Sequence, residues 1–299
     1  MMNPLTNRLV NTSKFMCKSN WRRVHTSRKL AVFYEPDRKS GFPNISDYKE
    51  EKLNPFQRIY RGYFQFIEEC GKLKEEIKNS LQLDPPIVKF PGEVDVQWKF
   101  NGDPKILDKW VVTCDSDYNH GYSKATVSLS PTGAGVFSGI IDTRVPQDGK
   151  LQRAGFCNLR SVIQRGPFKI EKPYQWFSYT HLILRVRGDG HSYMINLHLK
   201  NDFDVTWADL HSFPLYTRGG PYWQYVKIPF SKFYLGNRGK IQDSQLPLRL
   251  WEVMSISFTA AGISGPFKLE IDYIGVENDP KHYEQFAYEM YKPPHPYYI

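Results

Sequence analysis

The sequence predicts a mainly β protein, an antiparallel β-sandwich or jelly roll with an N-terminal helical extension. From Val94 to about Glu277, apolar and polar residues alternate with the period of two that half-buried strands show. Clusters of Gly, Pro, Asn and Asp divide this region into short runs, and no helical pattern lies between the runs. Because parallel strands need long crossover connections, usually helices, we expect antiparallel strands.

Residues 1–34 are predicted to be a mitochondrial transit peptide. They hold seven basic residues, many hydroxyl residues and no acidic residue, with Leu5, Leu9 and Met16 at helical spacing. Such a segment suits import driven by a negative-inside potential, with a cut expected between about Arg23 and Tyr34. The alternative is a disordered basic tail. Without these seven basic residues the formal net charge falls from +9 to +2, so nucleic acid is not an expected partner.

Residues 35–88 are predicted to be a linker followed by an amphipathic helix. Asn54 suits the N-cap, Pro55 suits the first helical position, and Asp84-Pro85-Pro86 forbids continuation. Apolar residues recur at steps of three and four at Ile59, Tyr63, Phe66, Ile67, Cys70, Leu73 and Ile77. Two interpretations stay open: a helix that docks on a partner or membrane surface, and a helix that packs on its own domain.

The sandwich itself is predicted over residues 89–278, with about eleven short strands. The expected strands are 94–100, 110–115, 124–130, 136–142, 155–162, 182–187, 193–199, 206–216, 226–230, 253–260 and 267–273. Arg187-Gly188-Asp189-Gly190 falls between two of them and is predicted to be a hairpin turn.

Residues 279–299 are predicted to be an aromatic and proline-rich extension. A short helix is expected around Tyr283 to Tyr291, and the prolines that follow it exclude regular structure. The aromatic residues favour contact with a surface over free disorder.

The motifs of common enzyme classes are absent. There is no Gly-x-Ser-x-Gly nucleophile elbow, phosphate-binding loop or dinucleotide fingerprint. Outside the predicted presequence, three widely spaced cysteines favour neither a disulfide framework nor a metal site. No run of about 18 apolar residues predicts a membrane-spanning helix. We therefore predict no catalytic residue and no cofactor.

Histidines and carboxylates raise two weaker hypotheses. His181, His191, His198 and His211 are close in sequence, but the strand pattern turns His181 and His198 away from the core, so surface or satisfied histidines are favoured over a metal site. Two carboxylate pairs, at 115/117 and 270/272, could serve acid/base chemistry or calcium binding. A short acidic loop and a solvated strand face explain them more simply.

Aromatic residues make up 15% of the chain, and several gather within twenty residues. Exposed rings on a sandwich could anchor a protein interface or stack on sugars, whereas buried rings would fill the core. The candidate partner-binding residues are Trp207, Tyr216, Trp223 and Tyr225.

Several motifs in order resemble the complex I intermediate-associated protein 30 family. They are Trp110-Val111-Val112-Thr113-Cys114-Asp115, Gly121-Tyr122-Ser123, Phe137-Ser138-Gly139, Gly155-Phe156-Cys157-Asn158-Leu159-Arg160-Ser161, Leu184-Arg185-Val186-Arg187-Gly188-Asp189-Gly190 with Tyr193, and Val226-Lys227-Ile228-Pro229-Phe230-Ser231-Lys232-Phe233. The resemblance covers about Lys89 to Glu277 and departs from the family at His120, where a glycine is common.

This resemblance implies a galactose-binding-like jelly roll in the mitochondrial matrix, associated peripherally with the inner membrane. It implies a non-catalytic chaperone that helps assemble the membrane arm of complex I. The implied partners are membrane-arm assembly intermediates and other assembly factors, including an acyl-CoA dehydrogenase-like protein. The alternative is a carbohydrate-binding module, which fits the fold class and the aromatic rings but not the leader; a hydrolase fits by fold analogy alone.

Overall fold

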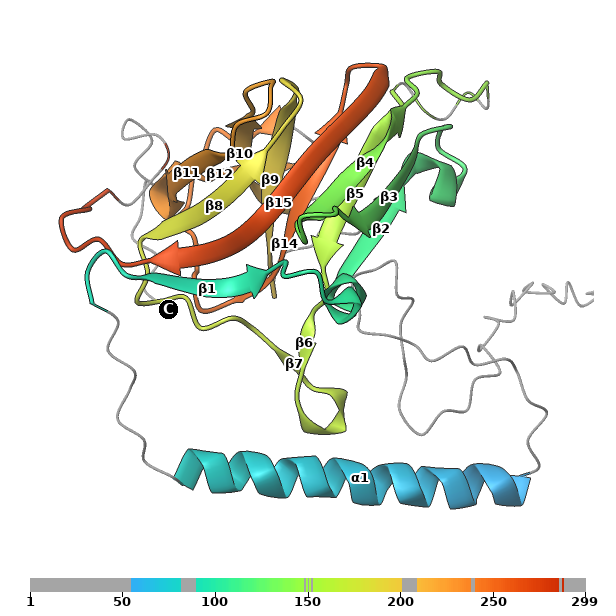
Figure 1. Ribbon diagram of the computed structural model, residues 1–299. Coiled ribbons are helices and arrows are strands. Elements are labelled where there is room, and N and C mark those ends of the chain that lie inside the picture. Colours follow the sequence, from blue (N-terminus) through green and yellow to red (C-terminus); the bar gives the residue numbers. More distant parts are fainter. Residues whose placement is uncertain are drawn as a thin grey trace, which may run out of the picture.

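Two antiparallel sheets pack face to face, and one long helix lies apart from them in the computed structural model (Figure 1). The structure describes residues 55–81, 90–147, 149, 151, 153–200, 209–237, 240–284 and 287. The predicted transit peptide, Trp207 and most of the C-terminal extension, including most of its predicted helix, lie outside these residues.

The first sheet has six strands and is organised around its longest strand, β15 (Gly265–Glu277). One edge of β15 pairs with β4 and then with β1, and the other edge pairs with β8. The other strands are β1 (Val94–Lys99), β3 (Lys124–Leu129), β4 (Gly135–Ile141), β8 (His181–Arg187) and β11 (Gln224–Pro229). In the order β11-β8-β15-β4-β3, the sheet joins segments from both ends of the described sandwich.

The second sheet has seven strands in the order β13-β12-β10-β9-β14-β5-β2. They are β2 (Trp110–Cys114), β5 (Phe156–Ser161), β9 (Ser192–Leu199), β10 (Asp209–Tyr216), β12 (Tyr234–Asn237), β13 (Lys240–Ile241) and β14 (Val253–Ala261). Short 3-10 turns connect strands at η2 (Pro104–Lys109), η3 (Asp115–Tyr118) and η5 (Phe230–Lys232).

The core lies between the two sheets and follows the period-two pattern. On β8 the alternate residues Leu182, Leu184 and Val186 are buried, as are Tyr193, Ile195 and Leu197 on β9. At one end four aromatic rings, from Trp98, Trp110, Tyr174 and Trp176, join this core. Each fully buried large apolar side chain contributes about 1.5–3 kcal/mol, so this interface stabilises the sandwich.

A small hairpin leaves the sandwich and reaches the helix. It consists of β6 (Gln164–Arg165), the 3-10 turn η4 (Pro167–Lys169) and β7 (Glu171–Lys172), and its tip approaches α1 (Pro55–Leu81) in Figure 1. Phe168 turns the chain sharply with a positive φ of 54°, and its backbone N–H donates to Glu69 Oε2 at 2.7 Å. The Phe66 and Phe168 rings lie 5.8 Å apart, and Lys172 pairs with Glu76.

Most of the apolar stripe of α1 is exposed, although the ring of Phe66 contacts that of Phe168 in the hairpin. Ile59 is 72% exposed, Tyr63 is 60% exposed and Ile77 is 50% exposed. The interpretation that this stripe packs on its own domain is therefore wrong for these residues. The hairpin holds the helix through Glu69 and Glu76 on its polar side and through Phe66 near the edge of the stripe.

The predicted antiparallel sandwich is confirmed, and each of the eleven expected strands has a counterpart in the structure. The expected strand 206–216 begins at Asp209, and residues 201–208 lie outside the described residues. The short strands β6, β7, β12 and β13 were not expected. They hold two to four residues, which is too short to display an alternating pattern.

The segment Arg187-Gly188-Asp189-Gly190 is not a hairpin turn, because the strands on either side belong to different sheets. β8 pairs with β11 and β15, whereas β9 pairs with β10 and β14. Asp189 fixes this connection: its carboxylate accepts hydrogen bonds from the backbone N–H of His191 at 3.1 Å and of Lys268 at 2.6 Å. The Tyr193 hydroxyl also donates to it at 3.1 Å. Sequence alternation alone does not reveal which sheet a strand joins.

Candidate functional site

The structure separates the four predicted partner-binding aromatics. Trp207 lies outside the described residues. Tyr216 ends β10 in the second sheet, where it follows the core residue Leu215 and is 69% exposed on the side away from the core. Trp223 immediately precedes β11 of the first sheet, and Tyr225 is the second residue of that strand. The structure thus brings two of the four together on one outer face.

A row of three side chains crosses this outer face. Tyr225 on β11 is directly opposite Arg185 on β8, and Arg185 is directly opposite Tyr273 on β15. Tyr225 is 55% exposed. Arg185 Nη1 donates to Asp272 Oδ2 at 2.6 Å, which holds the guanidinium between the two tyrosines. Directly opposed residues on neighbouring strands lie close enough for their side chains to touch.

The Trp223 ring lies near two arginines. The guanidinium carbon of Arg185 is 5.2 Å from the centroid of the Trp223 ring, and that of Arg187 is 4.9 Å from it. A guanidinium within about 6 Å of an indole face attracts it electrostatically. Arg187 is fixed by Glu270 and donates from Nη1 to the carbonyl of Pro221 at 3.2 Å. We call the surface formed by Arg185, Arg187, Trp223, Tyr225 and Tyr273 the aromatic–arginine face.

Glu270 supports this face as a buried anion. It is 5% exposed and pairs with Arg187 and, at 2.8 Å, with Lys268. Burial alone raises the pKa of its carboxyl, but hydrogen bonds from Lys268 and Arg187 outweigh this effect and lower the pKa. The expectation that the 270/272 pair marks a solvated strand face is therefore wrong for Glu270. Cross-strand cations permit its burial.

The two tyrosines of the face are neutral hydrogen-bonding groups. Burial raises the pKa of Tyr225 and the pKa of Tyr273 above the ordinary phenol value. Both hydroxyls therefore keep their protons at neutral pH. A surface of rigid aromatic rings, phenolic hydroxyls and arginines has the composition that dominates binding energy at protein interfaces.

The four histidines lie in separate places. His181 is on the outer side of β8, and His191 Nδ1 lies 2.9 Å from Asp189 in the connection to β9. His198 is on the outer side of the second sheet, where its Nε2 is 3.0 Å from the Ser257 hydroxyl. His211 is on the opposite side of that sheet, the side that faces the core, because its register partner is the core residue Leu197. Within the described ranges, no group of three potential ligands could hold a metal ion.

The orientation predicted for His181 and His198 is right, but neither is a surface residue, since both are buried. Burial lowers the pKa of His181, as do the nearby charges of Lys227 and His282. The His181 and His282 rings lie 4.9 Å apart, and the Asp279 backbone N–H donates to the Thr180 hydroxyl at 2.8 Å. The start of the C-terminal extension therefore packs beside β8.

Around His198, buried polar residues form hydrogen bonds across four strands of the second sheet. The Ser212 hydroxyl donates to Asn196 Oδ1 at 2.7 Å, and Asn196 Nδ2 donates to Thr259 at 2.9 Å. Thr259 donates in turn to Asn158 Oδ1 at 3.0 Å. Sequence reasoning missed this network, because its residues occupy the positions that alternation assigns to solvent.

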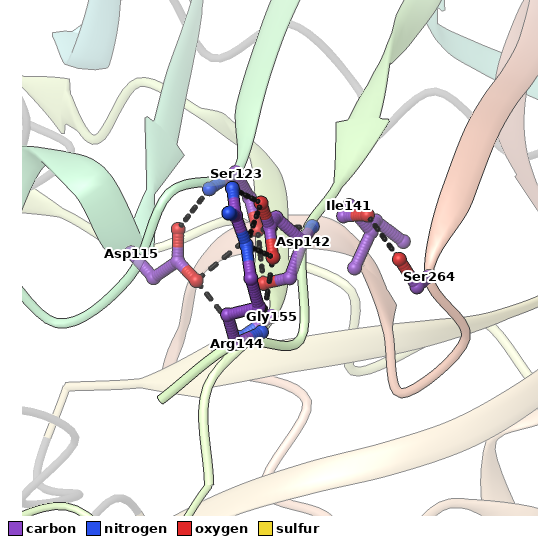
Figure 2. Close-up of polar contacts among 7 residues, drawn as sticks. All are labelled: Asp115, Ser123, Ile141, Asp142, Arg144, Gly155 and Ser264. Atoms are coloured by element: carbon purple, nitrogen blue, oxygen red, sulfur yellow. Dashed lines mark hydrogen bonds and ion pairs between the residues drawn. The ribbon is translucent and has the colours of Figure 1, made fainter. Parts of the chain in front are cut away.

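The short acidic loop predicted at 115/117 is the turn η3 (Asp115–Tyr118), and Asp115 within it is fully buried. Figure 2 shows its carboxylate between Ser123 and Gly155. The Ser123 backbone N–H donates to Oδ1 at 2.9 Å, while the Ser123 hydroxyl and the Gly155 N–H donate to Oδ2 at 3.1 and 2.8 Å. Three donors directed at one carboxylate satisfy an anion, and their positive ends would repel a cation.

The residues around Asp115 come from motifs that are far apart in sequence. A Cβ atom on Gly121 would lie 2.0 Å from Asp115 Oδ2, so this position requires glycine. Gly155 has a φ of +100°, a conformation that only glycine adopts readily. The Ser123 hydroxyl accepts from the Asp142 N–H at 3.1 Å, and Arg144 binds the Asp142 carboxylate beside it (Figure 2). The cluster ties three connections together at one end of the sandwich.

Comparisons with known proteins agree on one family. A family profile described as "Complex I intermediate-associated protein 30" matches residues 98–271. A Drosophila melanogaster protein named "Complex I intermediate-associated protein 30, mitochondrial" is 44% identical over 275 residues, 91% of each chain. A Mus musculus protein of the same name is 40% identical over 231 residues, covering 75% of this chain and 69% of that protein.

Among solved structures, the chain is similar to a family 11 carbohydrate-binding module of a Clostridium thermocellum cellulosomal cellulase. The TM-score is 0.43 and the sequence identity 14%, with 64% of this chain and 98% of that chain covered.

Proposed function

The chain belongs to the complex I intermediate-associated protein 30 family, and from this premise we propose that it is a non-catalytic assembly factor for mitochondrial respiratory complex I. The observation that carries the proposal is the similarity to the Drosophila protein, which is named for complex I intermediates and spans 91% of both chains. An acid-free basic leader independently supports a mitochondrial protein.

We further propose that the protein works in the matrix, at the surface of the inner membrane. There it binds an assembly intermediate of the membrane arm together with other assembly factors, including an acyl-CoA dehydrogenase-like protein. The family resemblance supports these partners. Among the described residues, no helix is long and apolar enough to cross a membrane.

The aromatic–arginine face is the surface that we assign to the protein partner. It combines three aromatic rings with two arginines, and ion pairs with Asp272 and Glu270 hold the arginines in place. Because these side chains are held in place before binding, they lose little conformational entropy when a partner binds. Carboxylates on the partner could accept hydrogen bonds from the exposed edges of the guanidinium groups.

The hydrogen bonds and ion pairs of the buried carboxylates agree with a non-catalytic role. Asp115 is saturated by three hydrogen-bond donors, and Glu270 is paired with two cations. A general base needs a carboxylate that can reach a substrate proton. Both groups instead stabilise the scaffold that presents the aromatic–arginine face.

Affinity purification from mitochondria tests the proposal. Wild-type protein should co-purify membrane-arm subunits and assembly factors, and Tyr225→Ala should retain less than about a tenth of them, because truncating an interface aromatic can cost about 2 kcal/mol or more. The matched control is Phe177→Ala, which removes an exposed aromatic ring from a turn outside the face.

Both variants must be compared at equal abundance and equal melting temperature. Equal capture of complex I subunits by Tyr225→Ala and Phe177→Ala would remove the aromatic–arginine face from the proposal. Normal complex I assembly in cells that lack the protein would overturn the proposed function itself.

A further inference from the structure

The helix α1 carries an exposed apolar face. On a helix of 3.6 residues per turn, the apolar side chains of α1 fall within one half of its circumference. They are Phe56, Ile59, Tyr60, Tyr63, Phe64, Phe66, Ile67, Cys70, Leu73, Ile77 and Leu81. Aside from Cys70, which is half-buried, each of these residues is exposed.

Charges are distributed unequally around this helix. Lys74 and Lys78 fall within the apolar half, at one and two turns after Cys70. The four acidic residues, Glu68, Glu69, Glu75 and Glu76, lie outside that half, and Glu69 and Glu76 contact the hairpin. The first thirteen residues of α1 contain two arginines and no acidic residue. The apolar half itself therefore carries positive charge alone, and the acidic residues lie on the polar half, with Glu75 next to the border.

We propose that this face of α1 lies in the surface of an anionic phospholipid bilayer. Helices that lie in the membrane interface combine a wide apolar face, aromatic rings and basic residues. Lysines at such a face place their stems along apolar surface and their ammonium groups among the phosphates. The inference deepens the proposed function, on which its setting at the inner membrane rests.

The width of the apolar face distinguishes a bilayer from a partner helix. A coiled-coil seam is a narrow stripe of two positions in seven. Here the apolar residues cover about half of the helix circumference, as expected for a helix half-immersed in lipid. At 1.5 Å per residue, the helix would lie along about 40 Å of membrane surface.

The hairpin β6–β7 leaves most of this face free for lipid. It binds the helix through Glu69 and Glu76, which lie on the polar side, more than a third of a turn from the centre of the apolar face. Its one ring contact with the apolar face is made by Phe66, near the edge of that face. Docking on a bilayer therefore requires no rearrangement of the described contacts, and the sandwich would remain on the aqueous side of the helix.

Vesicle flotation with the full chain tests the inference. The protein should float with vesicles of phosphatidylcholine and phosphatidylglycerol, and much less with phosphatidylcholine alone. Tyr63→Glu should bind the anionic vesicles at least about tenfold more weakly, because burying one large apolar side chain typically contributes more than the 1.4 kcal/mol that corresponds to a factor of ten. Tyr63 is 60% exposed, so the melting temperature should not change.

Asn79→Glu is the matched control, since it adds the same charge on the polar side of α1. It also controls for the basic residues 1–34, whose attraction to anionic lipid is equal in both variants. A second pair separates charge from hydrophobicity. Lys74→Gln/Lys78→Gln should reduce the preference for phosphatidylglycerol, whereas Lys105→Gln/Lys109→Gln, on η2, should not.

Equal flotation of Tyr63→Glu and Asn79→Glu would overturn the inference. So would a wild-type dimer in light scattering that Tyr63→Glu dissociates, because the occupant would then be a second copy. The vesicles contain no complex I protein, so this assay tests the bilayer contact alone. Co-purification of complex I subunits judges the proposed function separately.

Discussion

The Gly155 backbone N–H donates to the buried Asp115 carboxylate at 2.8 Å and joins two loops forty residues apart. Ser123 supplies the other two donors, from its backbone and its hydroxyl. Because the carboxylate has 0% exposure, water cannot replace any of these bonds.

Asp115→Asn is expected to destabilise the sandwich although it preserves shape. Each carboxylate oxygen faces a backbone N–H, so either orientation of the amide leaves one donor opposite an NH₂ group. The loss should be about 1–3 kcal/mol or more in the free energy of unfolding, measured by urea denaturation. Asp108→Asn removes the same charge at an exposed site and should have little effect. Equal midpoints would contradict this role of Asp115.

Gly121→Ala is expected to be destabilising for a steric reason. The new Cβ would lie 2.0 Å from Asp115 Oδ2, so the carboxylate must leave its donors or the loop must move. We expect a cost of about 1–3 kcal/mol, typical of overpacking, and a lower melting temperature. Gly71→Ala, in α1, meets no atom within 4 Å and serves as the control. A wild-type melting temperature for Gly121→Ala would show that the loop yields freely.

The stability of the protein is expected to fall as the pH decreases below about 6.5, the ordinary imidazole value. Burial, Lys227 and His282 lower the pKa of His181, so the unfolded chain binds this proton more tightly than the folded chain. The contribution of neutral His181 to stability is complete above the ordinary imidazole pKa. It is lost as the pH falls from that value towards the lowered pKa of the folded protein. Urea midpoints on either side of this pH should differ less in His181→Gln than in wild type. An unchanged pH dependence in that variant would exclude His181 as the source.

Glu270→Gln is expected to weaken both the sandwich and the aromatic–arginine face. The hydrogen bonds from Lys268 and Arg187 lower the carboxyl pKa, so the anion stabilises the fold above its ordinary pKa of about 4.5, and this contribution is lost as the pH falls through the lowered value. At neutral pH the loss should be about 1–3 kcal/mol in urea unfolding. Glu75→Gln, on the exposed side of α1, is the control. If Glu270→Gln and Glu75→Gln capture complex I subunits equally well, then Arg187 does not need the Glu270 carboxylate in order to position Trp223.

Import is predicted from the leader alone. Energised isolated mitochondria should shorten the chain by removing most of residues 1–34 and should protect the product from added protease. Arg22→Glu/Arg23→Glu should reduce import, because it removes positive charge from the leader. Full-length protein that remains accessible on the outer surface would argue for a basic tail instead.

The strands could be predicted because their inward residues alternate without interruption. On β8 and β9 every second residue is apolar, and the structure buries these residues in the core. Alternation assigns a residue to one face of a strand, but it does not say which strands are neighbours. Whether the predicted aromatics meet therefore depends on pairing: β11 beside β8 gathers Trp223 and Tyr225, whereas β10 takes Tyr216 to the other sheet.

Burial of polar residues could not be predicted for a related reason. Asp115 and Glu270 are buried because donors or cations from distant segments, at Gly155 and Arg187, satisfy them. No local pattern contains these partners. The motifs that carry the family resemblance did include Asp115, Gly121, Ser123 and Gly155, but their contact became visible only in three dimensions.

The pairing of β1 with β15 constrains when this protein can fold. Val94 is the register partner of Glu277, so the first sheet is closed by segments at opposite ends of the sandwich sequence. A chain that emerges from its N-terminus, from a ribosome or an import channel, exposes the unpaired edge of β1 until almost the entire sandwich has appeared. Such long-range pairing is intrinsically slow and leaves strand edges open to aggregation. Newly delivered chains should therefore depend on holding chaperones until β15 arrives.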